Sequence, residues 1–192
     1  MIDLDYTDYF WASDRIRLRG ITESDAESAF ANSLDSPARQ VLQLGIEVPT
    51  SVDTLRAELA KRASCKDVDG VILFAIEDSD GAYVGGISLH TPSLKNGTFS
   101  FGVTVHREHR GNGYAAEAIQ ILLRYAFHER RFQKCNSSCI ESNDASIALH
   151  KKLGFIEEGR RRRQFYLNGR FYDDILFGLT REEFDATIDG RE

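Results

Sequence analysis

The sequence predicts a single α+β domain, and three observations support this prediction. The chain has 192 residues, of which 42% are hydrophobic, enough to bury one sizeable core. Successive apolar segments in its middle alternate with the period of a strand and are joined by short turns, which indicates antiparallel hairpins. Segments with helical spacing precede and follow these strands, and no linker or repeat divides the chain.

The N-terminal third is predicted to form one strand and two helices. The alternating segment 14–19 reads as a strand. Capping-box patterns begin one helix over 22–34 and another over 50–63. The segment 36–49 between them has no clear period, so we expect a connecting loop there; a substrate-facing lip is the alternative.

The middle of the chain holds three strands. Segment 71–76 is apolar throughout, as expected of a central strand. Segment 83–90 follows a turn at Asp80-Gly81, and Asn96-Gly97 joins it to segment 98–105. Asn-Gly is a strong signal for a two-residue type I′ hairpin, so the three strands are expected to be sequential and antiparallel.

The C-terminal part mixes helices and strands. The expected elements are a helix over 115–126, a polar strand over 134–141, a helix over 143–153 ending at a left-handed Gly154, strands over 155–167 and 171–179 joined by Asn168-Gly169, and a short helix beginning at Thr180.

The strand over 98–105 leads into the next helix through a glycine-containing turn, Arg110-Gly111-Asn112-Gly113-Tyr114-Ala115. Small residues let a ligand approach the backbone, and the first N–H groups of a helix are free to bind it. The helix dipole and Arg110 add favourable charge for an anion. We therefore expect a phosphate site at this turn; a glycine turn without a ligand is the alternative.

The same turn also fits the weak dinucleotide fingerprint Gly111-x-Gly113-x-x-Ala116, with Glu141 as the acidic residue after the next strand. That fingerprint usually opens a parallel sheet, whereas the preceding strands here look antiparallel. About 50 residues follow the next strand, which is too few for a full doubly wound sheet. A nicotinamide-dependent oxidoreductase is therefore kept as an alternative.

One face of the helix over 143–153 carries an amide, a hydroxyl and an imidazole. Asn143, Ser146 and His150 stand at i, i+3 and i+7, so they share a face. Taken singly, each has a plainer interpretation: a helix cap, a small neutral residue and a surface histidine. After an anion-binding turn, the combination suggests a functional site.

Two stretches of the sequence resemble a known family. Residues 110–115 look like the Arg/Gln-x-x-Gly-x-Gly/Ala acetyl-CoA motif of the GNAT N-acetyltransferase superfamily. Residues 143–155 are similar to its Asn-x-x-(Ala/Ser)…(Lys)-Leu-Gly-Phe segment. The sequence is most similar to the Rim-type branch, which includes ribosomal-protein N-terminal and spermidine acetyltransferases, and residues 168–173 support that branch. The resemblance implies a single GNAT domain over 1–192, with a twisted, mixed, mostly antiparallel sheet and helices on both faces.

The resemblance also implies a site for acetyl-CoA. Backbone N–H groups of the turn would hold the pyrophosphate, the edge of the preceding strand would pair with the pantetheine arm, and Asn143 would contact the cofactor. The implied cofactor-binding residues are Val103, Thr104, Val105, Arg110, Gly111, Asn112, Gly113, Tyr114, Ala115, Asn143 and Lys152.

Acetyl transfer to an amine needs an unprotonated amine, a polarised carbonyl and a proton for the leaving thiolate. The Val105 N–H could polarise the carbonyl. Ser146 is similar to the serine that the Rim-type branch is thought to use toward the thiolate. His150 stands where many relatives carry a tyrosine, so Ser146 and His150 are the candidate catalytic residues. Relatives often carry a glutamate where this chain has Ser100, which leaves the general base unassigned.

We therefore expect an enzyme: an acetyl-CoA-dependent N-acetyltransferase that moves an acetyl group directly to a primary amine in a ternary complex. No activated nucleophile beside a base is evident, which argues against a covalent enzyme intermediate. The acceptor could be a protein N-terminus, a polyamine or a small-molecule amine. A non-catalytic CoA-sensing module is the second alternative, beside the oxidoreductase.

The composition limits which kinds of partner and which cellular compartment we expect for this protein. The formal net charge of −6 argues against a nucleic-acid binder. Three cysteines make no disulfide framework, which favours a reducing cytoplasm, and Cys135 and Cys139 are expected to be free thiols, with no metal site. The N-terminus does not look like a signal peptide and the longest apolar run, 71–76, is too short for a membrane span. The expected partners are acetyl-CoA and an amine, and both a monomer and a homodimer stay open.

Overall fold

The computed structural model describes residues 6–63 and 70–189. Its helices and strands are β1 (Ile16–Arg19), α1 (Ala26–Ser33), α2 (Ser36–Gln43), α3 (Val52–Ala63), β2 (Ile72–Asp78), β3 (Tyr83–Ser93), β4 (Thr98–Val105), α4 (Tyr114–Arg124), β5 (Lys134–Ile140), α5 (Asp144–Lys152), β6 (Ile156–Leu167), β7 (Arg170–Thr180) and α6 (Arg181–Asp189). Short 3-10 turns lie at 23–25 and 107–109, and α4 continues into a π-helical turn at 125–129.

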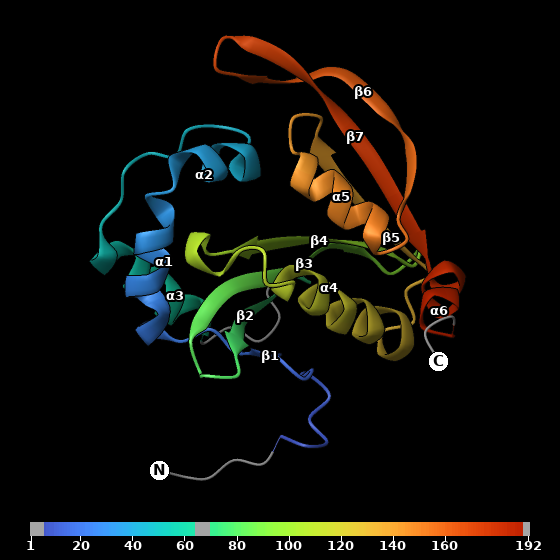
Figure 1. The fold of residues 1–192 in the computed structure, drawn as a ribbon, viewed down its shortest axis with the longest axis horizontal. Helices are drawn as coiled ribbons and strands as arrows, with labels where there is room; N and C mark the ends of the chain where they lie inside the picture. Colours follow the sequence, from blue (N-terminus) through green and yellow to red (C-terminus); the bar gives the residue numbers. More distant parts are fainter. Residues whose placement is uncertain (1–5, 64–69, 190–192) are drawn as a thin grey trace.

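The seven strands form one sheet in the order β1-β2-β3-β4-β5-β7-β6 (Figure 1). All neighbouring pairs are antiparallel except β4 and β5, so the sheet is mixed and mostly antiparallel, as predicted. The parallel pairing is short, because only Thr98 with Lys134 and Phe99 with Cys135 are in register. Beyond Phe99 the two strands separate, and we call this opening the β4–β5 divergence.

Helices cover both faces of the sheet, which confirms that prediction. On one face, α4, α5 and α6 pack over the larger core, in which Phe99, Leu122 and Phe177 are almost fully buried. On the other face, α1 and α3 bury a smaller cluster that contains Ala26 and Leu59. Each large apolar side chain buried in this way contributes roughly 1.5–3 kcal/mol to folding. In the described residues, no helix combines the length and apolarity that a membrane span requires.

The predicted loop over 36–49 is wrong, because its first part forms α2. Pro37 stands in the first turn of this helix, where the missing N–H costs nothing and the fixed φ suits helical geometry. None of residues 36–42 is buried. With eight residues α2 makes only about two turns, which is too short for a helical period to be read from the sequence alone.

Of the two turns predicted at Asn-Gly pairs, one is confirmed and the other is wrong. Leu167 pairs with Arg170, and both Asn168 (φ 50) and Gly169 (φ 80) are left-handed, so the β6–β7 hairpin has the predicted turn. In the β3–β4 hairpin, Ser93 pairs with Thr98, which leaves residues 94–97 in a longer loop. The predicted two-residue turn at Asn96-Gly97 is therefore wrong.

Candidate active site

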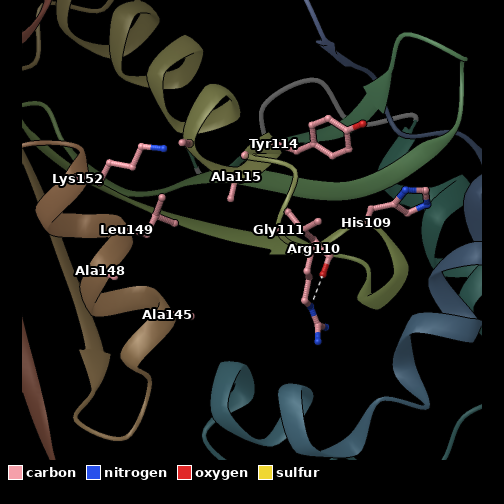
Figure 2. Close-up of a pocket in the computed structure, with 12 residues that line it drawn as sticks. His109, Arg110, Gly111, Tyr114, Ala115, Ala145, Ala148, Leu149 and Lys152 are labelled. Atoms are coloured by element: carbon pink, nitrogen blue, oxygen red, sulfur yellow. Dashed lines mark hydrogen bonds between the residues drawn. The ribbon is translucent and has the colours of Figure 1, made fainter.

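A pocket of about 340 Å³ opens where β4 ends and α4 begins (Figure 2). One wall consists of the end of β4, the glycine turn and the start of α4, and α5 forms the facing wall. The lining residues are Val105, His109, Arg110, Gly111, Gly113, Tyr114, Ala115, Ala116, Ala145, Ala148, Leu149 and Lys152. The pocket therefore brings together the two motifs of the sequence, the glycine turn and the helix that begins after Asn143.

The glycine turn leaves backbone donors free at the start of α4. Gly111 and Gly113 have φ values of 83 and 84, in the left-handed region that favours glycine. Gly113 is the N-cap of α4, and no side chain caps this helix. Within the described part of the chain, no hydrogen bond is seen from the N–H groups of residues 111–115. The turn thus has the free donors and the helix dipole that an anion requires.

Arg110 lines this pocket, and its side chain is engaged by two neighbouring groups. Its Nε donates to the Val105 carbonyl at 3.0 Å, and its Nη1 lies 2.8 Å from the carboxylate of Asp35, at the start of α2. Figure 2 shows the guanidinium directed away from the start of α4. Lys152 extends from α5 toward α4 and supplies a further cation to the pocket (Figure 2).

Arg15, which no sequence motif indicated, holds the turn from the outer side. Its Nη1 donates to the Asn112 carbonyl at 2.7 Å, and its Nε donates to Glu117 Oε1 in α4 at 2.6 Å. A Cβ on Gly113 would lie 2.9 Å from Arg15 Nη2. Gly113 therefore makes room for Arg15, while a Cβ on Gly111 would meet no atom within 4 Å.

Beyond Phe99, the edge of β4 at the divergence carries backbone groups that no neighbouring strand pairs, although the Val105 carbonyl accepts from Arg110 Nε. The His106 N–H donates to β3, at the Val84 carbonyl, whereas the Gly97 carbonyl accepts from β5, at the Lys134 N–H. Because these groups alternate along a strand, Val103 and Val105 direct theirs toward the divergence. They therefore lie where a pantetheine arm could pair with the strand.

Thr104, also expected to bind the cofactor, is placed differently. It pairs with Gly86 of β3. By the same alternation its N–H and carbonyl face β3. Direct backbone contact with a ligand in the divergence is thus not available to Thr104.

His150 is buried in the core and not a surface histidine, with 4% of its surface exposed. Its ring stacks on Phe177 with 4.6 Å between centroids. Nδ1 donates to the Ser146 carbonyl at 2.7 Å, and Nε2 lies 2.8 Å from Ser137 Oγ. Burial lowers the pKa of His150, so the ring is neutral near pH 7. Both ring nitrogens are therefore engaged within the protein.

Asn143 and Ser146 lie at the start of α5. The Asn143 Oδ1 accepts from the Ser146 N–H at 3.1 Å, so Asn143 caps the helix. Ser146 Oγ lies 3.4 Å from His150 Nδ1 and hydrogen-bonds with the Cys139 thiol of β5. Ser146 and His150 thus occupy the face of α5 next to the sheet, one helical face away from the residues that line the pocket.

The dinucleotide alternative loses its acidic residue. Glu141 Oε1 accepts from the Asp173 N–H at 3.0 Å, across to β7. The preceding strands are antiparallel, and the single parallel pair is short. The topological switch point that a dinucleotide-binding fold uses is therefore missing from the described sheet. In the same part of the chain, no three side chains of metal-binding type lie together.

Comparison with known proteins agrees with this geometry. The model of the acetyltransferase (GNAT) domain matches residues 15–156. The chain is 35% identical over 176 residues to the SPbeta prophage-derived uncharacterized N-acetyltransferase YokL of Bacillus subtilis (strain 168), covering 92% of this chain and 96% of that protein. It is 30% identical over 142 residues to the putative ribosomal N-acetyltransferase YdaF of the same organism, covering 73% and 76%.

Solved structures show the same fold. A probable acetyltransferase has a TM-score of 0.78 at 28% identity, over 88% of this chain and 95% of that chain. Spermidine N-acetyltransferase from Vibrio cholerae, solved with CoA and spermine, has a TM-score of 0.76 at 21% identity, over 90% and 99%. Because the family model covers most of the sequence and the YokL match nearly all of it, the chain belongs to the GNAT family and is an N-acetyltransferase that uses acetyl-CoA.

Proposed function

We propose that this enzyme transfers the acetyl group directly from acetyl-CoA to a primary amine while both substrates are bound. The observation that carries the proposal is the continuity of the unpaired β4 edge with the uncapped start of α4. A pyrophosphate binds free N–H groups at a helix start, and an amide-bearing arm pairs with a free strand edge. The two features adjoin in one pocket, as a ligand with both chemical groups requires.

The cofactor roles follow from this placement. The N–H groups of residues 111–115 and the Lys152 ammonium would hold the pyrophosphate. Val103 and Val105 would pair with the pantetheine arm. The capping bond of Asn143 uses only Oδ1, so its amide nitrogen can contact the cofactor.

The catalytic roles follow from where each proton can go. The arm enters at Val105 and the divergence closes at Phe99, so the thioester lies between them, beside the free N–H groups of β4. The N–H of Val105, or of Val103 one step further in, would polarise the carbonyl. Ser146 would give a proton to the thiolate. The Nδ1 proton of His150 is already donated to a backbone carbonyl, so we assign His150 to holding Ser146 in place.

The acceptor is proposed as a polyamine, a protein N-terminus or a small-molecule amine. The names of the relatives support this range, since one is a putative ribosomal N-acetyltransferase and another a spermidine N(1)-acetyltransferase. We further propose that residues 1–192 act as one domain and that the compartment is the cytoplasm, where Cys135 and Cys139 would stay reduced.

Ligand-induced stabilisation tests the proposal first. Acetyl-CoA and CoA should raise the melting temperature, because a ligand at a hundred times its Kd stabilises the native state by about 2.7 kcal/mol. NADH should not. A shift with NADH equal to that with acetyl-CoA would contradict the proposal and favour the oxidoreductase.

Turnover is tested next, with acetyl-CoA and a panel of spermidine, short peptides with free N-termini and simple primary amines, read out as released thiol. At least one amine should be acetylated. CoA binding with no turnover on any of them would favour the CoA-sensing module.

A further inference from the structure

We propose that His90 of β3 is the general base that takes the proton from the acceptor amine. This inference rests on the proposed acetyl transfer and adds the group that the sequence left unassigned. The base is needed because an alkyl ammonium cannot attack a carbonyl until it loses a proton. β4 itself supplies no base on the side from which an amine would approach.

The two faces of the sheet differ in chemistry near the divergence. On the face covered by α4 and α5, the β4 side chains are apolar and pack against the larger core. On the opposite face, β4 presents Ser100, Gly102 and Thr104, and β3 presents Ser88 and His90 beside them. A polar amine would therefore approach the thioester from this second face.

β5 continues the polar face across the divergence. Its Ser137 contacts His150 of α5 on the apolar face. Asn136 and Ser138, on either side of Ser137, therefore point to the polar face, and both are exposed. The amine would thus enter between two strands that both present polar side chains.

The His90 side chain crosses from β3 onto β4. His90 pairs with Ser100, and its Nε2 lies 2.8 Å from the position that a Cβ on Gly102 would occupy. No side chain on residue 102 could coexist with the imidazole in this position. The ring therefore fills, from the neighbouring strand, a place where β4 has no side chain of its own.

Hydrogen bonds leave one His90 nitrogen available. Ser88 Oγ lies 2.8 Å from Nε2 and 3.5 Å from the Gly102 carbonyl, to which it can donate. We assign the Ser88 proton to that carbonyl, so that Ser88 Oγ accepts Nε2–H and the lone pair of the neutral ring resides on Nδ1. Among residues 6–63 and 70–189, no hydrogen bond to His90 Nδ1 is seen.

The electrostatic surroundings suit a base. Burial lowers the pKa of His90, which keeps the ring neutral near pH 7 and ready to accept a proton. The side chain is only half-buried, so a substrate can reach it. The groups around it are hydroxyls: Ser88 bonds the ring, and Thr91 bonds Ser100 at 2.7 Å next to it.

The proposed reaction begins with deprotonation of the acceptor and ends with release of the amide and the CoA thiol. The acceptor ammonium gives a proton to Nδ1 of His90, directly or through one water molecule. The free amine attacks the thioester carbon, the new C–N bond forms, and the C–S bond breaks. The CoA thiolate takes up a proton, the nitrogen of the new amide loses its second proton, and the imidazolium returns its proton to water.

Substitution of His90 tests this assignment. His90→Gln keeps a polar side chain of similar size without a base, so kcat with the best amine of the panel should fall by about a hundred- to ten-thousandfold. The rise in melting temperature caused by CoA should stay as in the wild type. In His90→Ala, added imidazole should restore part of the lost kcat, because the vacated space admits it. His90→Gln should not respond, since its side chain fills that space.

His128→Gln is the matched control, because His128 is 40% exposed and pairs with Asp185 away from the divergence. It should leave kcat within about twofold. Unchanged kcat in His90→Gln, or loss of CoA stabilisation together with kcat, would overturn the role of His90. If His90→Gln does not fold, absence of imidazole rescue in a folded His90→Ala would overturn it. Failure of the wild type to acetylate any amine would overturn the proposed function itself, and this inference with it.

Discussion

Ser146 and His150 share one face of α5, yet their surroundings predict different effects on the enzyme. Ser146 is half-buried and its hydroxyl contacts the Cys139 thiol of β5, so Ser146→Ala should remove the proton donor proposed for the thiolate. We expect kcat to fall by roughly ten- to a thousandfold. The stabilisation by acetyl-CoA should be nearly unchanged. Initial rates and thermal shifts measure both quantities, and an unaltered kcat would mean that water protonates the thiolate.

His150→Ala should act on stability. The substitution removes a buried ring stacked on Phe177 and leaves the Ser137 hydroxyl and the Ser146 carbonyl without their partner. Such losses in a core cost about 2–4 kcal/mol. Urea unfolding measures the difference, with His128→Ala as an exposed control that should change by less than about 0.5 kcal/mol. A stable His150→Ala with only a raised KM for acetyl-CoA would show instead that the imidazole contacts the cofactor.

At the scale of elements, α2 is held by polar links at its start and near its middle. Asp35 at its start pairs with Arg110 of the glycine turn, and Gln40 exchanges two amide hydrogen bonds of 2.9 and 3.0 Å with Asn168 at the tip of the β6–β7 hairpin. Figure 1 shows α2 between α1 and that hairpin. Because none of its residues 36–42 is buried, few apolar contacts hold it.

Asp35→Asn should therefore loosen α2. Losing one ion pair of this exposure costs about 1 kcal/mol, which corresponds to roughly fivefold faster amide exchange. Hydrogen–deuterium exchange over residues 36–43 measures this change. Asp53→Asn in α3, which removes an ion pair with a carboxylate that is 84% exposed, is the control. Equal exchange of α2 in both variants would show that the Arg110 link does not hold the helix.

The apolar pattern of each helix and strand determines whether the sequence could predict it. Strands and core helices follow from apolar periodicity, since α4 buries five apolar residues at helical spacing and β4 turns Phe99, Phe101 and Val103 toward the core. The Asn-Gly rule succeeded at Asn168 but failed at Asn96. In the β3–β4 hairpin, the pairing shifts between His90 and Ser93, and Thr91 adopts a left-handed φ of 43. This irregularity lengthens the loop, and no local dipeptide signals it.

The candidate site likewise contains some residues that the sequence could predict and others that it could not. The glycine turn and α5 are contiguous motifs, so the order of amino acids is enough to identify their residues. Arg15 and Asp35 reach the glycine turn from the residues just before β1 and α2, and the proposed base His90 lies on β3; all three are far from the motifs in the sequence. Their contribution depends on strand order and on side-chain direction, which local patterns do not contain.

At the scale of the whole molecule, two buried histidines and the half-buried His90 predict how stability depends on pH. Burial lowers the pKa values of His90 and His150, and burial together with the nearby His109 lowers the pKa of His106 to about 4. His106 is 5% exposed and its Nδ1 lies 3.2 Å from Ser28 Oγ of α1. In the unfolded chain each histidine titrates near 6.5. Between these values the unfolded state binds more protons than the native state.

The histidines should make the protein less stable at acidic pH. Stability rises with pH wherever the unfolded state binds more protons, so the free energy of unfolding should fall as the pH drops from about 6.5 to about 4. His106 alone accounts for at most about 3 kcal/mol, from its shift of roughly 2.5 pH units at 1.36 kcal/mol each. Asp174 acts in the opposite direction, because burial raises its pKa and the native state then holds its proton more tightly.

Urea unfolding at pH 7, 6 and 5 measures this dependence. The wild type should lose stability at each step, with the steepest loss below pH 6, where the unfolded histidines take up their protons. His106→Gln should have a flatter profile, whatever its stability at pH 7, because one of the three proton-binding differences is gone. If His106→Gln has the same profile as the wild type between pH 7 and pH 5, His106 binds protons equally in both states, and its burial is not maintained in solution.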